Sequence, residues 1–178
     1  MEEEALEFAR NAHEGQLRKY IEEPYIEHPK RVAEMVRRVP HNSQMICAAY
    51  LHDVVEDTPI SVEDIREKFG KKIALLVEEL TDEYLKVNYP HLNRRRRKDL
   101  EVRRQANISP QAQTIKLADI IDNTRDIIKN DRNFARRYIP ELEALTEVLL
   151  QGDSELLELA RKEIKKAKEV LEEISEKK

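Results

Sequence analysis

The sequence is poor in the residues that build strands, tight turns and disulfides. It contains no Trp, only three Gly and a single cysteine, Cys47. Apolar residues recur at helical spacings and rarely alternate, so we predict an all-α fold. A lone cysteine cannot form an internal disulfide, which favours a reducing compartment such as the cytoplasm. No apolar run reaches transmembrane length and the N-terminus does not resemble a signal peptide, so we expect a cytoplasmic protein with no membrane partner.

Charge of neither sign dominates. Asp and Glu number 36 against 32 Lys and Arg, a formal charge of −4, which argues against a dedicated nucleic-acid binder. One basic run, Arg94 to Arg104, is either a solvated helix face or a wall that faces anionic phosphates, and we expect no stable nucleic-acid partner. The length suits a single domain over residues 1–178, and oligomers remain possible.

The stretch from Met45 to Asp57 is the centre of the predicted domain. Its first half is almost wholly apolar and free of Gly and Pro, which predicts a helix buried on most sides. Four ionisable residues then follow together: His52, Asp53, Glu56 and Asp57. On one helix, residues four apart share a face, so His52 should lie over Glu56 and Asp53 over Asp57. Such a cluster at the end of a core helix is costly unless a cation compensates it, and a metal ion does so best.

Other helices are expected over about residues 2–14, 29–39, 61–69, 73–81, 110–129 and 132–150, and from residue 153 onward. Ser109 and Pro110 are a typical N-cap and first helical residue, and they open a second apolar helix that polar residues interrupt. Residues 16–28 and 82–93 are expected to be loops, the second of them mobile. The last helices, 132–176, should pack on the body or on a partner.

Candidate metal ligands follow from this arrangement. They are His28, His52, Asp53 and one acid of the second apolar helix, for which Asp119 is the best candidate. Two imidazoles with carboxylates suit Mn, Fe or Zn, although the pattern alone leaves the grouping open. Arg18 and Lys19, in the first loop, are either solvated charges or ligand contacts.

Three blocks of sequence together resemble a known family. FARNAHEGQLRKYIEEPYIEHPKRVA, AAYLHDVVEDTPISVEDIREKFGKKIALLVEELTD and IKLADIIDNTRDI look like the signature blocks of the HD-domain alarmone hydrolases, in the same order. The resemblance covers about residues 5–128. It implies an all-helical HD fold, a single-domain bundle that holds one Mn²⁺ ion. The implied reaction removes pyrophosphate from the 3′ position of guanosine tetra- or pentaphosphate and leaves GDP or GTP.

The resemblance also implies roles for individual residues. The metal ligands carried over are His28, His52, Asp53 and Asp119. Glu56 and Asp57 match the acidic pair that positions and activates the attacking water. Arg18 and Lys19 match residues that hold the guanine, and Asn123 matches one that contacts the nucleoside. The expected partner is thus a guanine nucleotide substrate.

The sequence departs from the family pattern at Asp122, where an aromatic residue or a His is usual. An extra acid near an anion site could disfavour a 3′-pyrophosphate, so two alternatives remain. One is an HD-type phosphohydrolase of another nucleotide, such as a phosphorylated dinucleotide cofactor. The other is a non-catalytic module that binds the alarmone.

Overall fold

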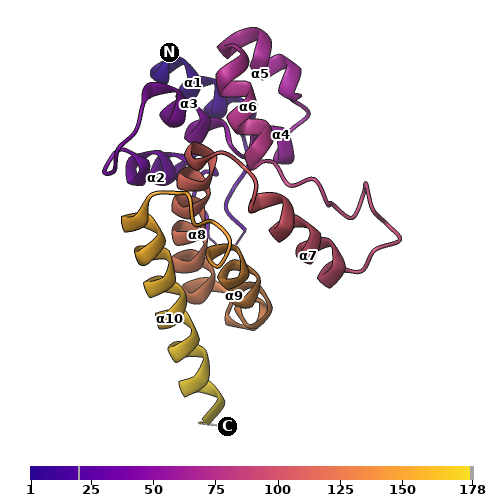
Figure 1. Cartoon of the computed structure of the whole chain (residues 1–178), viewed down its shortest axis with the longest axis vertical. Coiled ribbons are helices and arrows are strands. Elements are labelled where there is room, and N and C mark those ends of the chain that lie inside the picture. Colours follow the sequence, from indigo (N-terminus) through magenta and orange to yellow (C-terminus); the bar gives the residue numbers. More distant parts are fainter. Residues whose placement is uncertain (20, 177–178) are drawn as a thin grey trace.

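The chain folds into helices joined by short connections, as its composition predicts (Figure 1). The structure is a computed structural model that describes residues 1–19 and 21–176, with side chains to residue 173; Tyr20 and the last two residues of the predicted domain lie outside this range. The helices are α1 (Glu2–Ala12), α2 (Glu27–Val36), α3 (Ser43–Leu51), α4 (Val54–Asp57), α5 (Val62–Phe69), α6 (Lys71–Leu80), α7 (Arg94–Gln105), α8 (Pro110–Asn130), α9 (Arg132–Thr146) and α10 (Ser154–Glu176). In the described residues the only extended pairing is an isolated bridge between Leu17 and Pro24.

Helices α3 and α8 form the centre of the molecule. Ile46, Cys47 and Leu51 of α3 are fully buried, which confirms the predicted core helix. Helix α8 contacts α2, α3 and α6 above it and α9 and α10 below it, so it joins the two halves seen in Figure 1. Burial of a large aliphatic side chain contributes roughly 1.5–3 kcal/mol, and these two helices supply many such residues.

The predicted central helix is wrong in one respect, because it is not continuous. α3 ends at Leu51, and α4 begins at Val54 after a turn at His52 and Asp53. The carbonyl oxygen of Ala49, the helical acceptor for the Asp53 N–H, accepts a hydrogen bond from His52 Nδ1 at 2.8 Å. The chain keeps its direction, since Asp57 N–H still donates to the Asp53 carbonyl at 2.9 Å. Asp53 and Asp57 therefore stay one helical turn apart despite this break.

Most other helix ends follow their capping residues. Ser61 and Asp64 form a capping box at the start of α5, and Ser109 caps α8 ahead of Pro110 as predicted. Gly70 ends α5 with a φ of 85°, a value that favours glycine. Helix α9 ends at Thr146, a turn earlier than the predicted boundary near residue 150.

The long coil between α6 and α7 is anchored by one buried carboxylate. Glu101 of α7 is 4% exposed and accepts hydrogen bonds from the backbone N–H groups of Glu83 and Tyr84, at 3.0 and 3.1 Å. Arg104 donates to Glu101 at 2.6 Å and to the carbonyl of Thr81 at 2.8 Å. Helix α7 therefore holds the coil at its start and places it beside the end of α6.

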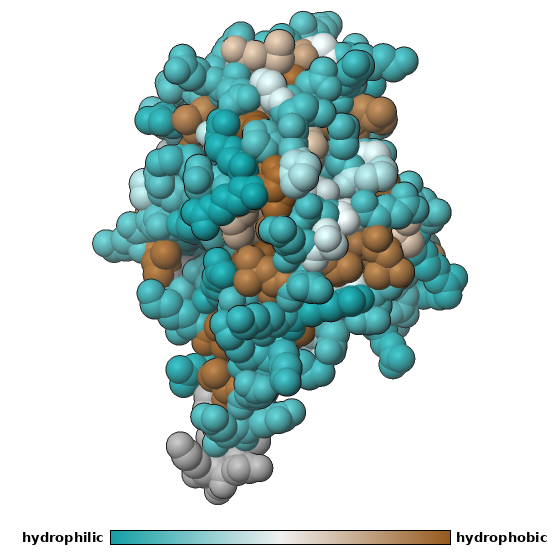
Figure 2. Space-filling model, turned by 60° about the vertical axis from the view of Figure 1, so that its left-hand side comes forward, coloured by the Kyte–Doolittle hydropathy of each residue, from teal (hydrophilic) through white to brown (hydrophobic). Residues whose placement is uncertain are grey.

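The surface carries no extended apolar face in the view of Figure 2, where brown patches are separated by hydrophilic side chains. Helix α10 buries its apolar stripe on α8 and α9, with Ala160, Ile164 and Ala167 each almost inaccessible. Among the described residues, no helix has both the length and the apolar composition that crossing a membrane requires.

Candidate functional site

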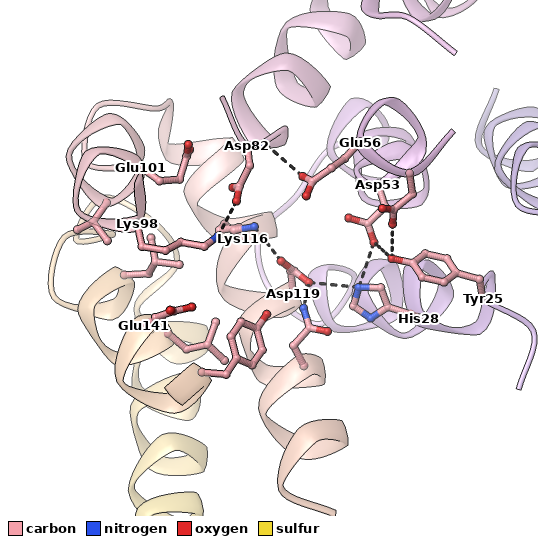
Figure 3. Close-up of a pocket in the computed structure, with 16 residues that line it drawn as sticks. Tyr25, His28, Asp53, Glu56, Asp82, Lys98, Glu101, Lys116, Asp119 and Glu141 are labelled. Atoms are coloured by element: carbon pink, nitrogen blue, oxygen red, sulfur yellow. Dashed lines mark hydrogen bonds and ion pairs between the residues drawn. The ribbon is translucent and has the colours of Figure 1, made fainter. Parts of the chain in front are cut away.

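The predicted site residues gather around one cavity of about 240 Å³ (Figure 3). Helices α2, α4, α7, α8 and α9 contribute its walls, so segments far apart in sequence meet there. Six of the nine predicted site residues line it: His28, Asp53, Glu56, Asp57, Asp119 and Asn123. The cavity therefore brings together the ionisable end of the core helix and the polar interruptions of α8.

His28 lies in the first turn of α2, and its ring is almost fully buried, with 1% exposed. Its Nε2 is 3.2 Å from Asp119 Oδ1 and 3.4 Å from Asp53 Oδ2. Its Nδ1 is 2.7 Å from Asp122 Oδ2. Burial alone would lower the pKa of His28, but hydrogen bonds to these three carboxylates hold it well above its ordinary value.

His52 presents the other imidazole. Its Nδ1 carries the hydrogen, since the Ala49 carbonyl 2.8 Å away can only accept. Its Nε2 is buried without a hydrogen-bond partner, 3.1 Å from Asp53 Oδ2 and 3.7 Å from Asp119 Oδ1. Burial opposes the charged ring, yet the charge of Asp53 and the nearby Asp119 carboxylate raise the pKa of His52 to about 9.

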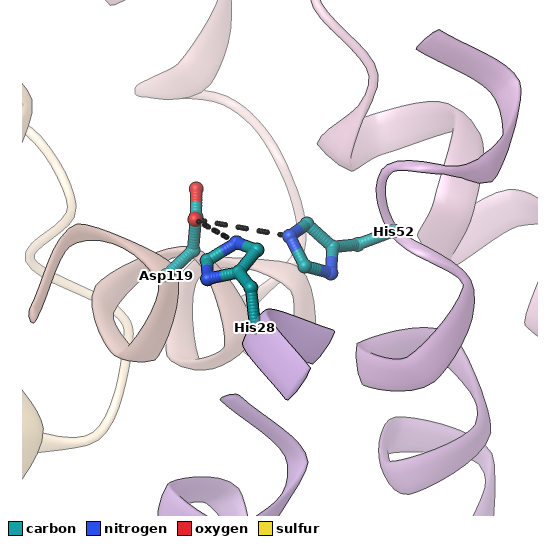
Figure 4. Close-up of side chains that lie close together, drawn as sticks. All are labelled: His28, His52 and Asp119. Atoms are coloured by element: carbon teal, nitrogen blue, oxygen red, sulfur yellow. Dashed lines mark ion pairs between the residues drawn. The ribbon is translucent and has the colours of Figure 1, made fainter. Parts of the chain in front are cut away.

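These groups fit a divalent metal ion. Ligand atoms of His28, His52 and Asp119 all lie within 4.8 Å of one another (Figure 4), and Asp53 Oδ2 contacts both rings. An orphaned, buried imidazole nitrogen beside two carboxylates is the arrangement that a cation completes. Burial would raise the pKa of Asp119, but the Lys116 charge and both histidines hold it well below its usual range, so the carboxylate stays ionised.

Glu56 stands at the mouth of the cavity, apart from the ligand cluster. Its Oε2 accepts a hydrogen bond from the backbone N–H of Asp82 at 3.3 Å, as Figure 3 shows. Much of the residue reaches solvent, but its carboxyl is crowded by protein. This loss of water and the charges of Asp82 and Asp53 outweigh Lys116 and raise the pKa of Glu56 to about 7.

Asp57 is linked to Asp53 through Tyr25, a residue that was not predicted from the sequence. The Tyr25 hydroxyl is 2.7 Å from Asp57 Oδ2 and 2.8 Å from Asp53 Oδ2, so Asp53 and Asp57 share a face as predicted. Partial burial and the Asp53 charge raise the pKa of Asp57. Tyr25 lies one turn before His28, and that spacing was the available signal.

Two lysines bring positive charge to the cavity. Lys116 Nζ is 3.0 Å from Asp119 Oδ2, and Lys98 Nζ is 2.8 Å from Asp82 Oδ2. Burial opposes the Lys116 charge, but Asp119, Asp82 and Glu56 hold its pKa well above the ordinary value. Lys116 lies three residues before Asp119 on α8, so helical spacing could have found it.

The basic residues of α7 have two roles: one lines the cavity, and several arginines bind neighbouring segments. Of its seven basic residues, Lys98 alone lines this cavity. Arg94 donates to both oxygens of Glu141, at 2.8 and 2.7 Å, and Arg97 donates to the carbonyl of Leu92. Together with Arg104 on the α6 end, these arginines hold α7 in place.

The three predicted substrate contacts lie at different depths. Asn123 lines the cavity and donates to Asp119 Oδ1 at 2.6 Å. Arg18 donates to Asn123 Oδ1 at 3.3 Å and to Asp126 at 2.7 Å, behind the lining residues. Lys19 Nζ lies 5.1 Å from the centre of the Phe134 ring on α9. Asn123 thus links Asp119 of the histidine cluster to the loop that carries Arg18.

Asp122 does not line the cavity. Its carboxylate contacts His28 at 2.7 Å and Arg31 Nε at 2.7 Å, and its side chain is 8% exposed. His28 and Arg31 therefore compensate the negative charge of this extra acid, outside the cavity in which an anion would bind.

Comparison with known proteins agrees with the geometry. The HD domain family matches residues 5–144. The chain is 38% identical over 130 residues to guanosine-3′,5′-bis(diphosphate) 3′-pyrophosphohydrolase of Drosophila melanogaster, covering 71% of this chain and 69% of that protein. The Mus musculus protein of that name is 34% identical over 168 residues, 90% of each chain.

A solved structure described as a metazoan ortholog of SpoT that hydrolyses ppGpp superposes with a TM-score of 0.82, at 31% identity, covering 93% of this chain and 94% of that one. The predicted fold class and family resemblance are thereby confirmed. The chain belongs to the HD domain family, and within it to the HD-domain guanosine-bis(diphosphate) pyrophosphohydrolases.

Proposed function

We propose that this protein hydrolyses guanosine tetra- and pentaphosphate at the 3′ position, giving pyrophosphate and GDP or GTP. The observation that carries the proposal is the cluster of two imidazoles and two carboxylates in a cavity whose rim bears a carboxyl with a pKa near 7. Relatives at 34–38% identity over most of the chain carry the name of this reaction. A guanine nucleotide is thus the proposed partner, and the reducing cytoplasm the proposed compartment.

The ligands we propose for the metal are His28, His52, Asp53 and Asp119. Both histidines can offer Nε2, because Nδ1 of each faces an acceptor, and the two acids supply oxygen. Two nitrogens with two oxygens suit Mn²⁺, which we propose as the ion. Such an ion, when bound, polarises a phosphoryl oxygen and lowers the pKa of a bound water toward neutrality.

Glu56 is the proposed general base. With a pKa of about 7 it is substantially ionised at neutral pH and still basic enough to take a proton from water. The water oxygen bonds to the phosphorus next to ribose O3′, and the bond from that phosphorus to O3′ breaks. O3′ leaves as the ribose hydroxyl, with the proton that Glu56 took from the water. Tyr25 holds the Asp57 and Asp53 carboxyls beside this path.

Lys116 and Lys98 offset the charge of the phosphates. Each already contacts a carboxylate in the cavity, so the lining has basic and acidic groups close together. A highly anionic substrate can compete with Asp82 for Lys98, which lies nearer the surface. Asn123, with Arg18 behind it, is the proposed contact for the nucleoside, and Lys19 completes that proposed set.

A product-resolved nucleotide panel tests the proposal. Protein stripped of metal and reloaded with Mn²⁺ is given guanosine tetraphosphate, pentaphosphate, and a dinucleotide cofactor with a 2′-phosphate. We expect pyrophosphate, with GDP or GTP, from the first two. Release of inorganic phosphate from the dinucleotide alone would assign the site to another nucleotide. Binding of the alarmone without turnover would make the protein a binding module.

A further inference from the structure

Asp122 sits among hydrogen-bond donors only. His28 Nδ1 is 2.7 Å from its Oδ2, and Arg31 Nη2 is 3.2 Å from that same oxygen. Arg31 Nε is 2.7 Å from its Oδ1. The Asp122 side chain is 8% exposed, so water supplies little alternative. Oδ2 of Asp122 therefore accepts from both His28 and Arg31, and Oδ1 accepts from Arg31.

This arrangement decides which nitrogen of His28 faces the cavity. An ionised carboxylate can only accept, so the nitrogen beside it, Nδ1, carries a hydrogen. Nε2 is left to face Asp53 and Asp119, 3.4 and 3.2 Å away. A ring turned the other way would lose the Asp122 contact, and we therefore expect one orientation to prevail.

We propose that Asp122 is a positioning residue for the metal centre, which fixes the tautomer and the ring orientation of His28 and thereby strengthens metal binding. This inference rests on the proposed function, in which His28 is a metal ligand. Carboxylates that orient a ligating histidine commonly change metal affinity by about 10–100-fold when they are altered.

Arg31 completes the arrangement. Its Nη1 donates to both oxygens of Glu23, at 3.0 and 2.9 Å, while its other nitrogens hold Asp122. The Glu23 carbonyl accepts from the backbone N–H of Arg18 at 2.9 Å. The loop that carries Arg18 is thus tied to the same arginine that aligns the Asp122 carboxylate.

The chemistry of an amide gives a specific test. In the Asp122→Asn variant the side chain has one oxygen and one NH₂ group, yet both ends still face donors. In either orientation of the amide, the NH₂ group faces a donor of His28 or of Arg31, and no hydrogen bond can form there. Adding Arg31→Met removes the arginine donors from both ends, so that the amide oxygen can face His28 while the NH₂ group opposes no donor. If Asp122 only filled space, a second substitution at Arg31 would not be expected to restore Mn²⁺ affinity.

Metal-stripped variants are titrated with MnCl₂, and free Mn²⁺ is followed by its EPR signal. We expect Asp122→Asn to bind Mn²⁺ about 10–100-fold more weakly than wild type. The Asp122→Asn/Arg31→Met double variant should recover part of that loss. Arg31→Met alone should weaken Mn²⁺ binding less than Asp122→Asn does, because the carboxylate still accepts from His28. Asp126→Asn is the matched control, because Asp126 is also on α8 and paired with an arginine, Arg18, at 2.7 Å. Its Mn²⁺ affinity should be that of wild type.

Wild-type affinity in Asp122→Asn, or a double variant weaker than the single one, would overturn the inference. If Asp122→Asn does not fold, two variants without the buried charges decide: Asp122→Asn/Arg31→Met must bind Mn²⁺ more tightly than Asp122→Leu/Arg31→Met, and equal affinity refutes the role. The proposed metal site fails separately, since wild-type protein would then bind no Mn²⁺ at all. The proposed substrate fails separately in the nucleotide panel, where Mn²⁺-loaded wild type would release no pyrophosphate from guanosine tetraphosphate.

Discussion

Replacement of Glu56 by glutamine separates chemistry from structure at this site. Gln has nearly the same volume, and its carbonyl oxygen can keep the 3.3 Å hydrogen bond from the Asp82 N–H. It cannot accept a proton from water. Because Glu56 lies outside the ligand cluster, metal content should be unchanged in Glu56→Gln.

The Glu56→Gln substitution is expected to lower kcat. General-base catalysis is worth about 10²–10⁴-fold, which corresponds to about 2.7–5.5 kcal/mol of barrier. Wild-type kcat should rise with pH through about 7, the pKa of Glu56, and this rise should vanish in Glu56→Gln. The assay is pyrophosphate release from guanosine tetraphosphate with Mn²⁺, measured as kcat and KM from pH 5.5 to 9.

Stability supplies an independent check on the same carboxyl. The pKa of Glu56 is raised in the folded state, so its contribution is fully present below about 4.5 and is lost as pH rises through about 7. Metal-free wild type should therefore lose stability relative to Glu56→Gln over that window, in urea titrations. Loss of the metal in Glu56→Gln would make Glu56 a ligand. Full turnover would move the base elsewhere, with Asp57 the next candidate.

Three further predictions concern the ligand cluster and its support. Asp53→Asn should lose metal, measured by elemental analysis, together with activity. Mn²⁺ binding at pH 7 should release about one to two protons per ion, because the pKa of His52 is about 9 and the ligand must be neutral; calorimetry in buffers of different ionisation enthalpy measures this. Tyr25→Phe removes hydrogen bonds to two carboxyls and should lower kcat about tenfold or more, with Mn²⁺ affinity reduced less.

Each of these has a result that contradicts it. Full Mn²⁺ occupancy in Asp53→Asn would remove Asp53 from the ligand set. Binding without proton release at pH 7 would mean that the imidazoles are neutral before the ion arrives. A Tyr25→Phe variant with unchanged kcat would show that Asp57 and Asp53 need no hydroxyl, and Tyr89→Phe, on the coil, serves as its control.

The sequence predicted the parts of the site that depend on local spacing. Asp53 and Asp57 share a face because a helical turn separates them, and the Tyr25 hydroxyl meets both. Apolar composition was sufficient to identify α3 and α8 as the core, since few other segments could be buried on most sides. Which carboxylate of α8 would face the histidines came from the family resemblance as much as from spacing.

Contacts between distant segments could not be predicted in this way. The partners of Asp122 come from α2, and no local pattern ties residue 122 to residues 28 and 31. The acid at position 122, where the family has an aromatic residue or a His, suggested a negative charge near the phosphates. In the structure, the Asp122 carboxylate instead faces His28 and Arg31. The turn at His52 was missed because helix propensity does not register a side chain that competes for a backbone carbonyl.

The anchoring of the coil by Glu101 has a practical consequence for labelling the protein. The hydrogen bonds of Glu101 end at Tyr84, and beyond them Val87 is 81% exposed. An affinity tag or fluorescent reporter inserted beside Val87 would lengthen a segment whose start is already fastened to α7. Loop length adds little entropic cost, so the insertion should leave Asp82 and the cavity wall in place. A reporter there would replace no residue that lines the cavity.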